Sequence, residues 1–147
     1  PGYSGQPAEV YFPRQYYYFR EQYIDLYVEP LSVGSKIELQ PIYFQQSKAV
    51  ILDKSYPELS RLAGLLLDNP NLYIRVEGHT DNIGQASELQ ILSEQRARAI
   101  KDFLIAKGVS PERTETIGFG ARHPLNENDS EESRAQNRRV EIKVTKI

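Results

Sequence analysis

The feature that most constrains the fold is a segment of period-two alternation followed directly by a long segment of helical periodicity. Residues 72–79 alternate apolar and polar side chains, which is typical of a strand with one buried face. Residues 87–107 repeat apolar positions at helical spacing, and Gly108 follows as a stop signal. A strand and a long helix joined by a short polar turn favour a layered α/β sheet with crossover connections.

Two segments upstream of this pair also have clear patterns. Residues 55–68 place their apolar side chains on one helical face, and Ser55 and Glu58 have the spacing of a capping box. Residues 37–44 favour a strand, which Pro41 restricts to an edge position or a bend. We therefore expect a strand and then a helix before residue 70.

The rest of the chain continues the alternation of strands and helices. Ser87 and Gln90 offer a second capping box, at the start of the long helix. Residues 114–118 favour a short strand, and residues 126–137 favour a polar connection with room for a helical turn. Residues 139–144 alternate again and predict a strand whose apolar members Val140, Ile142 and Val144 face inward.

Charge and cysteine content exclude several classes of protein. The net charge of −2 counts against nucleic-acid binding, which needs a clustered basic surface. The chain contains no cysteine, which rules out a disulfide scaffold, cysteine metal ligands and a cysteine nucleophile. No apolar run approaches the roughly 20 residues of a spanning helix. The chain opens on Pro1 without a signal peptide, and we interpret it as a piece of a larger protein.

Tyrosine is concentrated near the N-terminus, because eight of the ten tyrosines lie in residues 1–44. Residues 16–19 and 23–28 favour strands by residue type. From the change in composition we predict an N-terminal segment of residues 1–35 and a main domain of residues 36–147. The sequence leaves open whether the N-terminal segment ends a preceding domain or adds strands to the main sheet.

One arginine in the long helix lies where an apolar residue is expected. At 100° per residue from Leu89, Arg96 falls at about 340°, between Leu92 at about 300° and Ile100 at about 20°. Arg98 falls on the opposite, solvent-facing side. A guanidinium turned toward the core must be paired, because otherwise its desolvation costs several kcal/mol.

Asp81 is the candidate partner of Arg96. It follows a core strand, in the turn that leads to the helix of Arg96, and ligands of open α/β sheets gather at the carboxyl ends of strands. Two interpretations remain open. One is an ion pair that only holds the turn to the helix. The other is a pocket with one negative and one positive group, suited to a zwitterionic ligand.

An enzymatic function has weak support. His79 and Asp81 with His123 could form a metal site, or His79 could act as a base beside a carboxylate. The sequence contains only two histidines, no His-Glu-x-x-His helix and no Gly-x-Ser-x-Gly turn. Loop positions account for both histidines. We therefore predict no catalysis, no metal and no cofactor.

Four blocks in order give the chain a resemblance to a known family. The turn 76–84, the helical block 92–97, Gly118-Phe119-Gly120 followed by Pro124, and the closing block 137–142 resemble the OmpA-like C-terminal family. That family includes peptidoglycan-associated lipoproteins and flagellar stator domains. The resemblance covers roughly residues 36–147, and it implies a two-layer α/β sandwich with a mixed sheet covered by two main helices.

The resemblance also implies a function and a location. In the family, the aspartate of the turn and the arginine of the helix bind diaminopimelate of the peptidoglycan stem peptide; by position these are Asp81 and Arg96. Asp81 would take the ammonium, and Arg96 would take the carboxylate through a forked pair. The implied partner is peptidoglycan, and the implied location is the periplasm, with outer-membrane attachment through a region outside this chain.

Secondary contacts follow from the same resemblance. Ser47 and Lys48, after the first strand, would lend backbone donors. The resemblance also suggests that Thr80, Asn82 and Leu92 line the site. Arg138 and Arg139 come just before an alternating strand, so we expect one to face the pocket and the other solvent, and we favour Arg139 as the pocket wall.

Two departures from the family pattern bear on the ligand. Leu89 stands where the family often has asparagine, and Gln45-Gln46 replaces a frequent Asp-Phe. The alternative function is therefore a structural or protein-interaction module of an outer-membrane assembly that has lost its ligand.

Overall fold

In the computed structural model, residues 31–147 are described. Their elements, in chain order, are β1 (Lys36–Ile37), η2 (Asp53–Ser55), α2 (Tyr56–Asp68), β2 (Tyr73–His79), α3 (Ala86–Ala106), η3 (Pro111–Arg113), β3 (Thr114–Gly118), α4 (Glu131–Asn137) and β4 (Arg139–Lys146). The strands form one sheet in the order β1-β4-β2-β3. The β2–β3 pair is parallel, and the β1–β4 and β2–β4 pairs are antiparallel.

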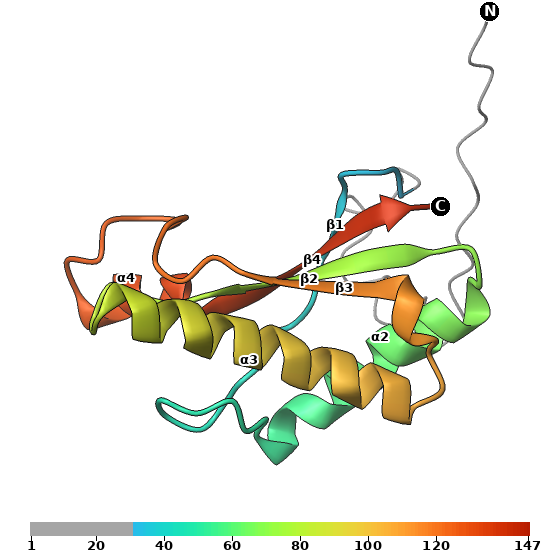
Figure 1. Ribbon diagram of the computed structural model, residues 1–147, viewed down its shortest axis with the longest axis horizontal. Helices are drawn as coiled ribbons and strands as arrows, with labels where there is room; N and C mark the ends of the chain where they lie inside the picture. Colours follow the sequence, from blue (N-terminus) through green and yellow to red (C-terminus); the bar gives the residue numbers. More distant parts are fainter. Residues whose placement is uncertain (1–30) are drawn as a thin grey trace, which may run out of the picture.

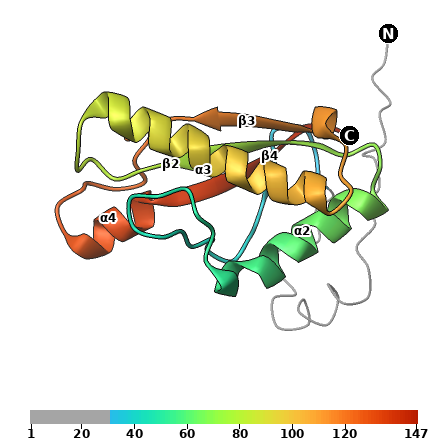
Figure 2. The ribbon, with the colours of Figure 1, turned by 60° about the horizontal axis from the view of Figure 1, so that its bottom comes forward.

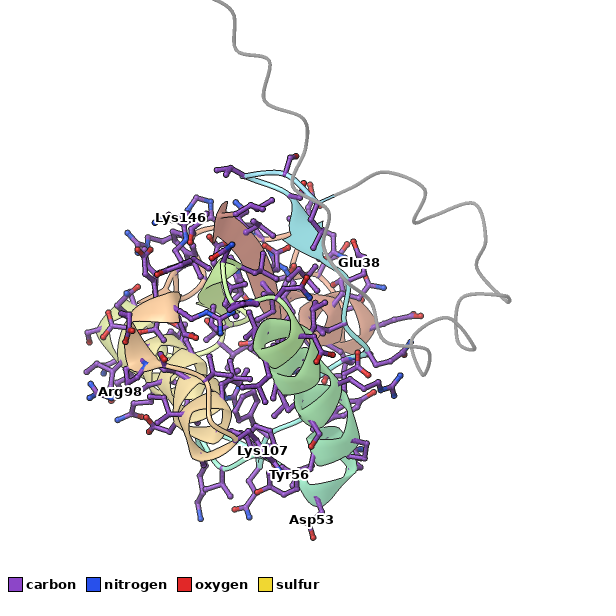
Figure 3. The ribbon with its side chains drawn as sticks, turned by 90° about the vertical axis from the view of Figure 1, so that its right-hand side faces the viewer. Glu38, Asp53, Tyr56, Arg98, Lys107 and Lys146 are labelled. Carbon is purple, nitrogen blue, oxygen red and sulfur yellow. The ribbon has the colours of Figure 1, made fainter. Side chains whose placement is uncertain are left out.

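The two long helices cover one face of this sheet. Figures 1 and 3 show α2 and α3 on the same side of the strands. Between the helices and the sheet lies a single hydrophobic core, built from α2, α3, β2 and β4 and including Leu59, Leu66, Ile74, Ile100 and Ile142. The predicted two-layer α/β sandwich with a mixed sheet is therefore confirmed.

Helix α2 buries the predicted apolar face, but its first turn is not closed by a capping box. The Ser55 hydroxyl makes no capping hydrogen bond; it accepts one from the backbone N–H of Tyr43 at 2.7 Å. Glu58 likewise accepts from the backbone N–H of Gln40 at 3.1 Å. Both side chains therefore hold the segment that precedes the helix.

These two contacts explain why the strand predicted over residues 37–44 is wrong in length. Strand β1 ends at Ile37, and beyond it only Phe44 forms an isolated bridge, with Ile51. Pro41 has no N–H to donate to a ladder. The backbone donors of Gln40 and Tyr43 are already used by the side chains of Glu58 in α2 and Ser55 in η2.

Strand β2 is more deeply buried than its alternation predicts. Leu72, Ile74 and Val76 are buried as expected, but the polar Glu77 and His79 are only 2 % and 3 % exposed. Because β2 lies between β4 and β3, neighbouring strands flank these side chains on both sides. The end of β2 is therefore an interior position on both faces of the sheet.

Helix α3 matches the predicted long helix, and Arg98 on its outer side projects away from the core (Figure 3). The second predicted capping box is wrong, because the residue before the helix is Gln85 and no side chain caps it. Ser87 is exposed, and the Gln90 amide instead donates to the Gly118 carbonyl at 2.6 Å. That bond joins the first turns of α3 to the end of β3.

The C-terminal part of the chain follows the predicted order. Strand β3 spans the predicted residues 114–118, and β4 buries Ile142 and Val144 on its inner side. The polar connection contains α4, whose Ser130 forms a capping box with Ser133.

Residues 31–35 are attached to the sheet, because Gly34 donates to the Val144 carbonyl and Val144 donates to the Ser35 carbonyl. The strand predictions for residues 16–19 and 23–28 lie outside the described residues, so the boundary after residue 35 stays a prediction. Within residues 31–147, no helix is long and apolar enough to cross a membrane.

Candidate functional site

The residues singled out in the sequence lie at the end of the sheet where β2 finishes. Figures 1 and 2 show the loop after β2 and helix α4 together at this end. The loop of residues 45–50 extends toward them from the start of α2 (Figure 2). Three segments that are distant in the sequence therefore surround the first half of α3.

Arg96 is half-buried in this region and is bound to the 45–50 loop. Its Nε donates to the Lys48 carbonyl at 3.0 Å, and one terminal nitrogen donates to the Gln45 carbonyl at 3.4 Å. The guanidinium also lies over the Phe44 ring, 5.0 Å from its centroid. These contacts orient the cation through neutral groups.

The electrostatic surroundings of Arg96 agree with this geometry. Burial lowers the pKa of Arg96 from its usual value; the nearby positive charge of Arg138 lowers it further, and the negative charge of Asp81 opposes both. Among residues 31–147, no carboxylate forms an ion pair with Arg96. Arg96 is therefore a positioned cation that can still accept an anionic partner.

Asp81 is buried, 8 % exposed, and both of its carboxylate oxygens are engaged. Oδ1 accepts from the backbone N–H of Ile83 at 3.0 Å, which shapes the turn after β2. Oδ2 accepts from Nη1 of Arg138 at 2.8 Å. The alternative of a direct Asp81–Arg96 ion pair is therefore wrong: Arg138, which lies between the end of α4 and the start of β4, is the partner of Asp81.

The structure brings Arg138, not the predicted Arg139, into contact with Asp81. Arg139 forms an ion pair with Glu141 at 3.2 Å and donates to the His123 carbonyl at 3.0 Å. The reason is strand parity, because alternate residues of a strand face opposite sides. Arg139 shares its side of β4 with Glu141, whereas Arg138, the residue before the strand, reaches Asp81.

Glu131 of α4 was missed by the sequence reasoning. It is an exposed residue whose Oε1 accepts from Nη2 of Arg138 at 2.6 Å. Arg138 thus bridges a buried carboxylate, Asp81, and an exposed one, Glu131. The sequence offered one signal for this pair: Glu131 and Arg138 lie at the two ends of the same short helix, α4.

The remaining residues predicted for the site surround the Asp81–Arg96 region to different extents. Ser47 has a φ of 57° and forms the turn that presents the Lys48 carbonyl to Arg96. Thr80 is buried and donates to the Asp81 carbonyl at 2.8 Å. Asn82 is exposed and Leu92 is partly buried.

Leu89, one of the two departures, packs beneath the turn that carries Asp81. A β-carbon added at Gly84 would lie 3.5 Å from a methyl group of Leu89. Leu89 therefore fills space under the loop and leaves the charged groups in place.

A cluster of metal-ligand type lies on the other face of the sheet. Glu77, His79 and Glu141 place one ligand atom each within 4.8 Å of one another. Cationic side chains already lie against both carboxylates: Arg75 and Lys143 on Glu77, and Lys36 and Arg139 on Glu141. A divalent cation would enter a strongly positive neighbourhood, so we assign no metal there. This cluster also differs from the His79, Asp81 and His123 set considered from the sequence, because Asp81 pairs with Arg138.

Comparison with known proteins shows to which family this α/β sandwich belongs. A model of the OmpA family matches residues 43–138. The chain therefore belongs to the OmpA family, and the resemblance seen in the four sequence blocks is confirmed.

Among curated relatives, the chain is 36 % identical over 115 residues to the outer membrane porin F of Pseudomonas fluorescens, covering 78 % of this chain and 35 % of that protein. It is 38 % identical over 104 residues to the peptidoglycan-binding protein ArfA of Mycobacterium tuberculosis, covering 71 % of this chain and 32 % of that protein. The chain thus spans about a third of the length of these relatives.

Solved structures with the same fold include the peptidoglycan-associated lipoprotein of Burkholderia pseudomallei. It superposes with a TM-score of 0.67 at 27 % identity, covering 71 % of this chain and 90 % of that one. The C-terminal domain of Helicobacter pylori MotB gives a TM-score of 0.68 at 27 % identity, covering 75 % of this chain and 87 % of that one.

Proposed function

We propose that the domain binds bacterial peptidoglycan non-covalently through the diaminopimelate of the stem peptide, without catalysis. Binding would attach an outer-membrane protein to the cell wall from the periplasmic side. The observation that carries the proposal is Arg96, a half-buried guanidinium held by carbonyl oxygens and an aromatic ring and without an ion-pair partner among residues 31–147. Relatives named as peptidoglycan-binding and peptidoglycan-associated proteins support the choice of ligand.

The chemistry of diaminopimelate matches the two charges of the site. One carbon of this residue carries both an ammonium and a carboxylate, so the two groups project from the same atom in a fixed relative geometry. The carboxylate would bind the planar guanidinium of Arg96 through two parallel hydrogen bonds, which a lysine in its place could not form. The ammonium would bind Asp81, whose Oδ2 now accepts from Arg138.

Sedimentation with purified sacculi tests the proposal. We expect Asp81→Ala and Arg96→Ala to lose about 2–5 kcal/mol of binding, because each leaves one charge of the bound ligand without its partner. Arg98→Ala is the matched control, since Arg98 lies on the exposed side of the same helix, and it should bind like the wild type. Circular dichroism must stay native in all three variants. Binding that survives both site substitutions would refute the proposal.

The same assay with two kinds of wall material tests the role of Arg96. Peptidoglycan that carries lysine in place of diaminopimelate lacks the carboxylate that Arg96 would bind. We expect it to bind much more weakly than diaminopimelate-containing wall. Equal binding of the two materials would remove Arg96 from the recognition mechanism.

A further inference from the structure

The guanidinium of Arg138 lies between two carboxylates of different character. Nη1 donates to Oδ2 of the buried Asp81 at 2.8 Å, and Nη2 donates to Oε1 of Glu131 at 2.6 Å. The Glu131 side chain is 68 % exposed, whereas that of Asp81 is 12 % exposed. The Arg138 guanidinium therefore bridges a buried carboxylate of the site and a solvent-exposed carboxylate of α4.

This arrangement sets the cost of bringing an ammonium to Asp81. Oδ1 already accepts from the Ile83 N–H, and an ammonium that approaches Oδ2 must share or take the position that Arg138 holds. Displacing Arg138 toward solvent would leave a guanidinium without its charge-assisted hydrogen bond unless a second carboxylate retains it. Glu131 already makes that second bond.

We propose, resting on the function proposed above, that Glu131 is a positioning residue that draws Arg138 away from Asp81 and so makes Asp81 available to the ammonium of the ligand. Glu131 does not touch the ligand. It competes for Arg138 before binding and retains Arg138 after binding. Glu131 lies on α4, so a residue outside the Asp81–Arg96 pair would adjust how strongly the ligand binds.

The neighbouring positive charge supports the same direction of movement. Arg138 lies near enough to Arg96 to oppose the charge of its guanidinium. When Arg138 moves toward Glu131, repulsion of Arg96 falls and the carboxylate of the ligand meets a less crowded cation. Both halves of a zwitterion therefore benefit from the pull of Glu131.

The experiment measures the Kd of the full chain for a soluble stem peptide that contains diaminopimelate, by titration calorimetry. We expect Glu131→Gln to raise the Kd by about two- to fivefold, the range of an exposed ion pair. Glu132→Gln is the matched control, because Glu132 is the next residue of the same helix and is also exposed; its Kd should equal that of the wild type. A Kd for Glu131→Gln that equals or falls below that of Glu132→Gln would overturn the proposal.

Two further arms separate positioning from a merely structural effect. With the same peptide acetylated on the side-chain amine, no ammonium reaches Asp81, so Glu131→Gln and wild type should bind equally. In an Arg138→Gln background, Glu131→Gln should have no additional effect. A full effect of Glu131→Gln in either arm would refute the mechanism.

The outcome is distinguishable from failure of the proposed function. If Asp81→Ala and Arg96→Ala leave peptide binding intact, the proposed function fails. If these two variants abolish binding and Glu131→Gln behaves like Glu132→Gln, only the role of Glu131 fails.

Discussion

His79 shows how strongly this sheet constrains a single side chain. It is 3 % exposed, and its ring stacks on that of Phe119 with centroids 5.2 Å apart. Within the part of the chain that the structure describes, neither ring nitrogen has a hydrogen-bond partner, and Nε2 lies 3.5 Å from Glu141. Burial lowers the pKa of His79 to about 4; the charge of Arg139 acts in the same direction, and Glu141 and Glu77 oppose it.

This lowered pKa predicts that folding stability depends on pH in the range where unfolded histidine titrates. Between pH 6.5 and 4 the unfolded chain binds a proton at His79 that the folded chain does not, so stability falls as the pH falls through this window. We expect a loss of about 2 kcal/mol between pH 7 and pH 5, measured by urea denaturation.

The matched variants are His79→Gln and His123→Gln. The first removes the group and should flatten the pH dependence over this range. The second replaces an exposed histidine and should preserve it. If the stability of His79→Gln depends on pH as strongly as that of the wild type, groups other than His79 cause the dependence.

At the scale of elements, α3 packs tightly against the ends of β2 and β3. A β-carbon added at Gly78 of β2 would overlap the Ser93 carbonyl, and one at Gly118 of β3 would overlap the Ser93 hydroxyl. The Ser93 hydroxyl also accepts from the backbone N–H of Gly120 at 2.9 Å. The absence of side chains at these two glycines therefore lets α3 lie directly on the ends of β2 and β3, beside the site.

We predict that Gly78→Ala destabilises the domain by about 1–3 kcal/mol or more, because backbone on both sides must move to admit one methyl group. Equilibrium denaturation measures this loss. The variant should also weaken peptide binding, since the turn that carries Asp81 begins two residues later. A variant with wild-type stability would show that α3 can move away from the sheet at little cost.

Elements differed in how well local pattern predicted them. The long helix and strand 139–144 were predicted because their buried faces impose a strong periodicity on the sequence. The two capping boxes were wrong because Ser55, Glu58 and Gln90 make tertiary hydrogen bonds to distant backbone in place of local ones. A capping motif predicts a hydrogen bond within the first turn of a helix. In these two helices the same side chains bond to backbone groups that are distant in the sequence.

At the scale of the whole molecule, the described residues share one hydrophobic core. Apart from Leu89, the buried apolar residues of α2, α3, β2 and β4 belong to a single cluster, and Leu31 packs against it. No part of residues 31–147 forms a second core. The domain should therefore respond to denaturation as one unit.

We predict that a fragment of residues 31–147 unfolds in a single cooperative transition, with coincident curves by fluorescence and far-ultraviolet circular dichroism. The full chain is the control for the proposed boundary near residue 35. Two separated transitions in the fragment would show that the helices and the sheet do not share one core.

The amino-acid sequence by itself determined the layered α/β class, the buried faces of both long helices, and the unusual inward position of Arg96. These follow from short-range periodicity, which is written directly in the order of residues. Only the tertiary structure decided which charges meet. Arg138 pairs with Asp81, and Arg96 binds the carbonyls of the 45–50 loop. Such pairings depend on how segments separated by 48 to 57 residues pack together, and no local pattern contains that distance.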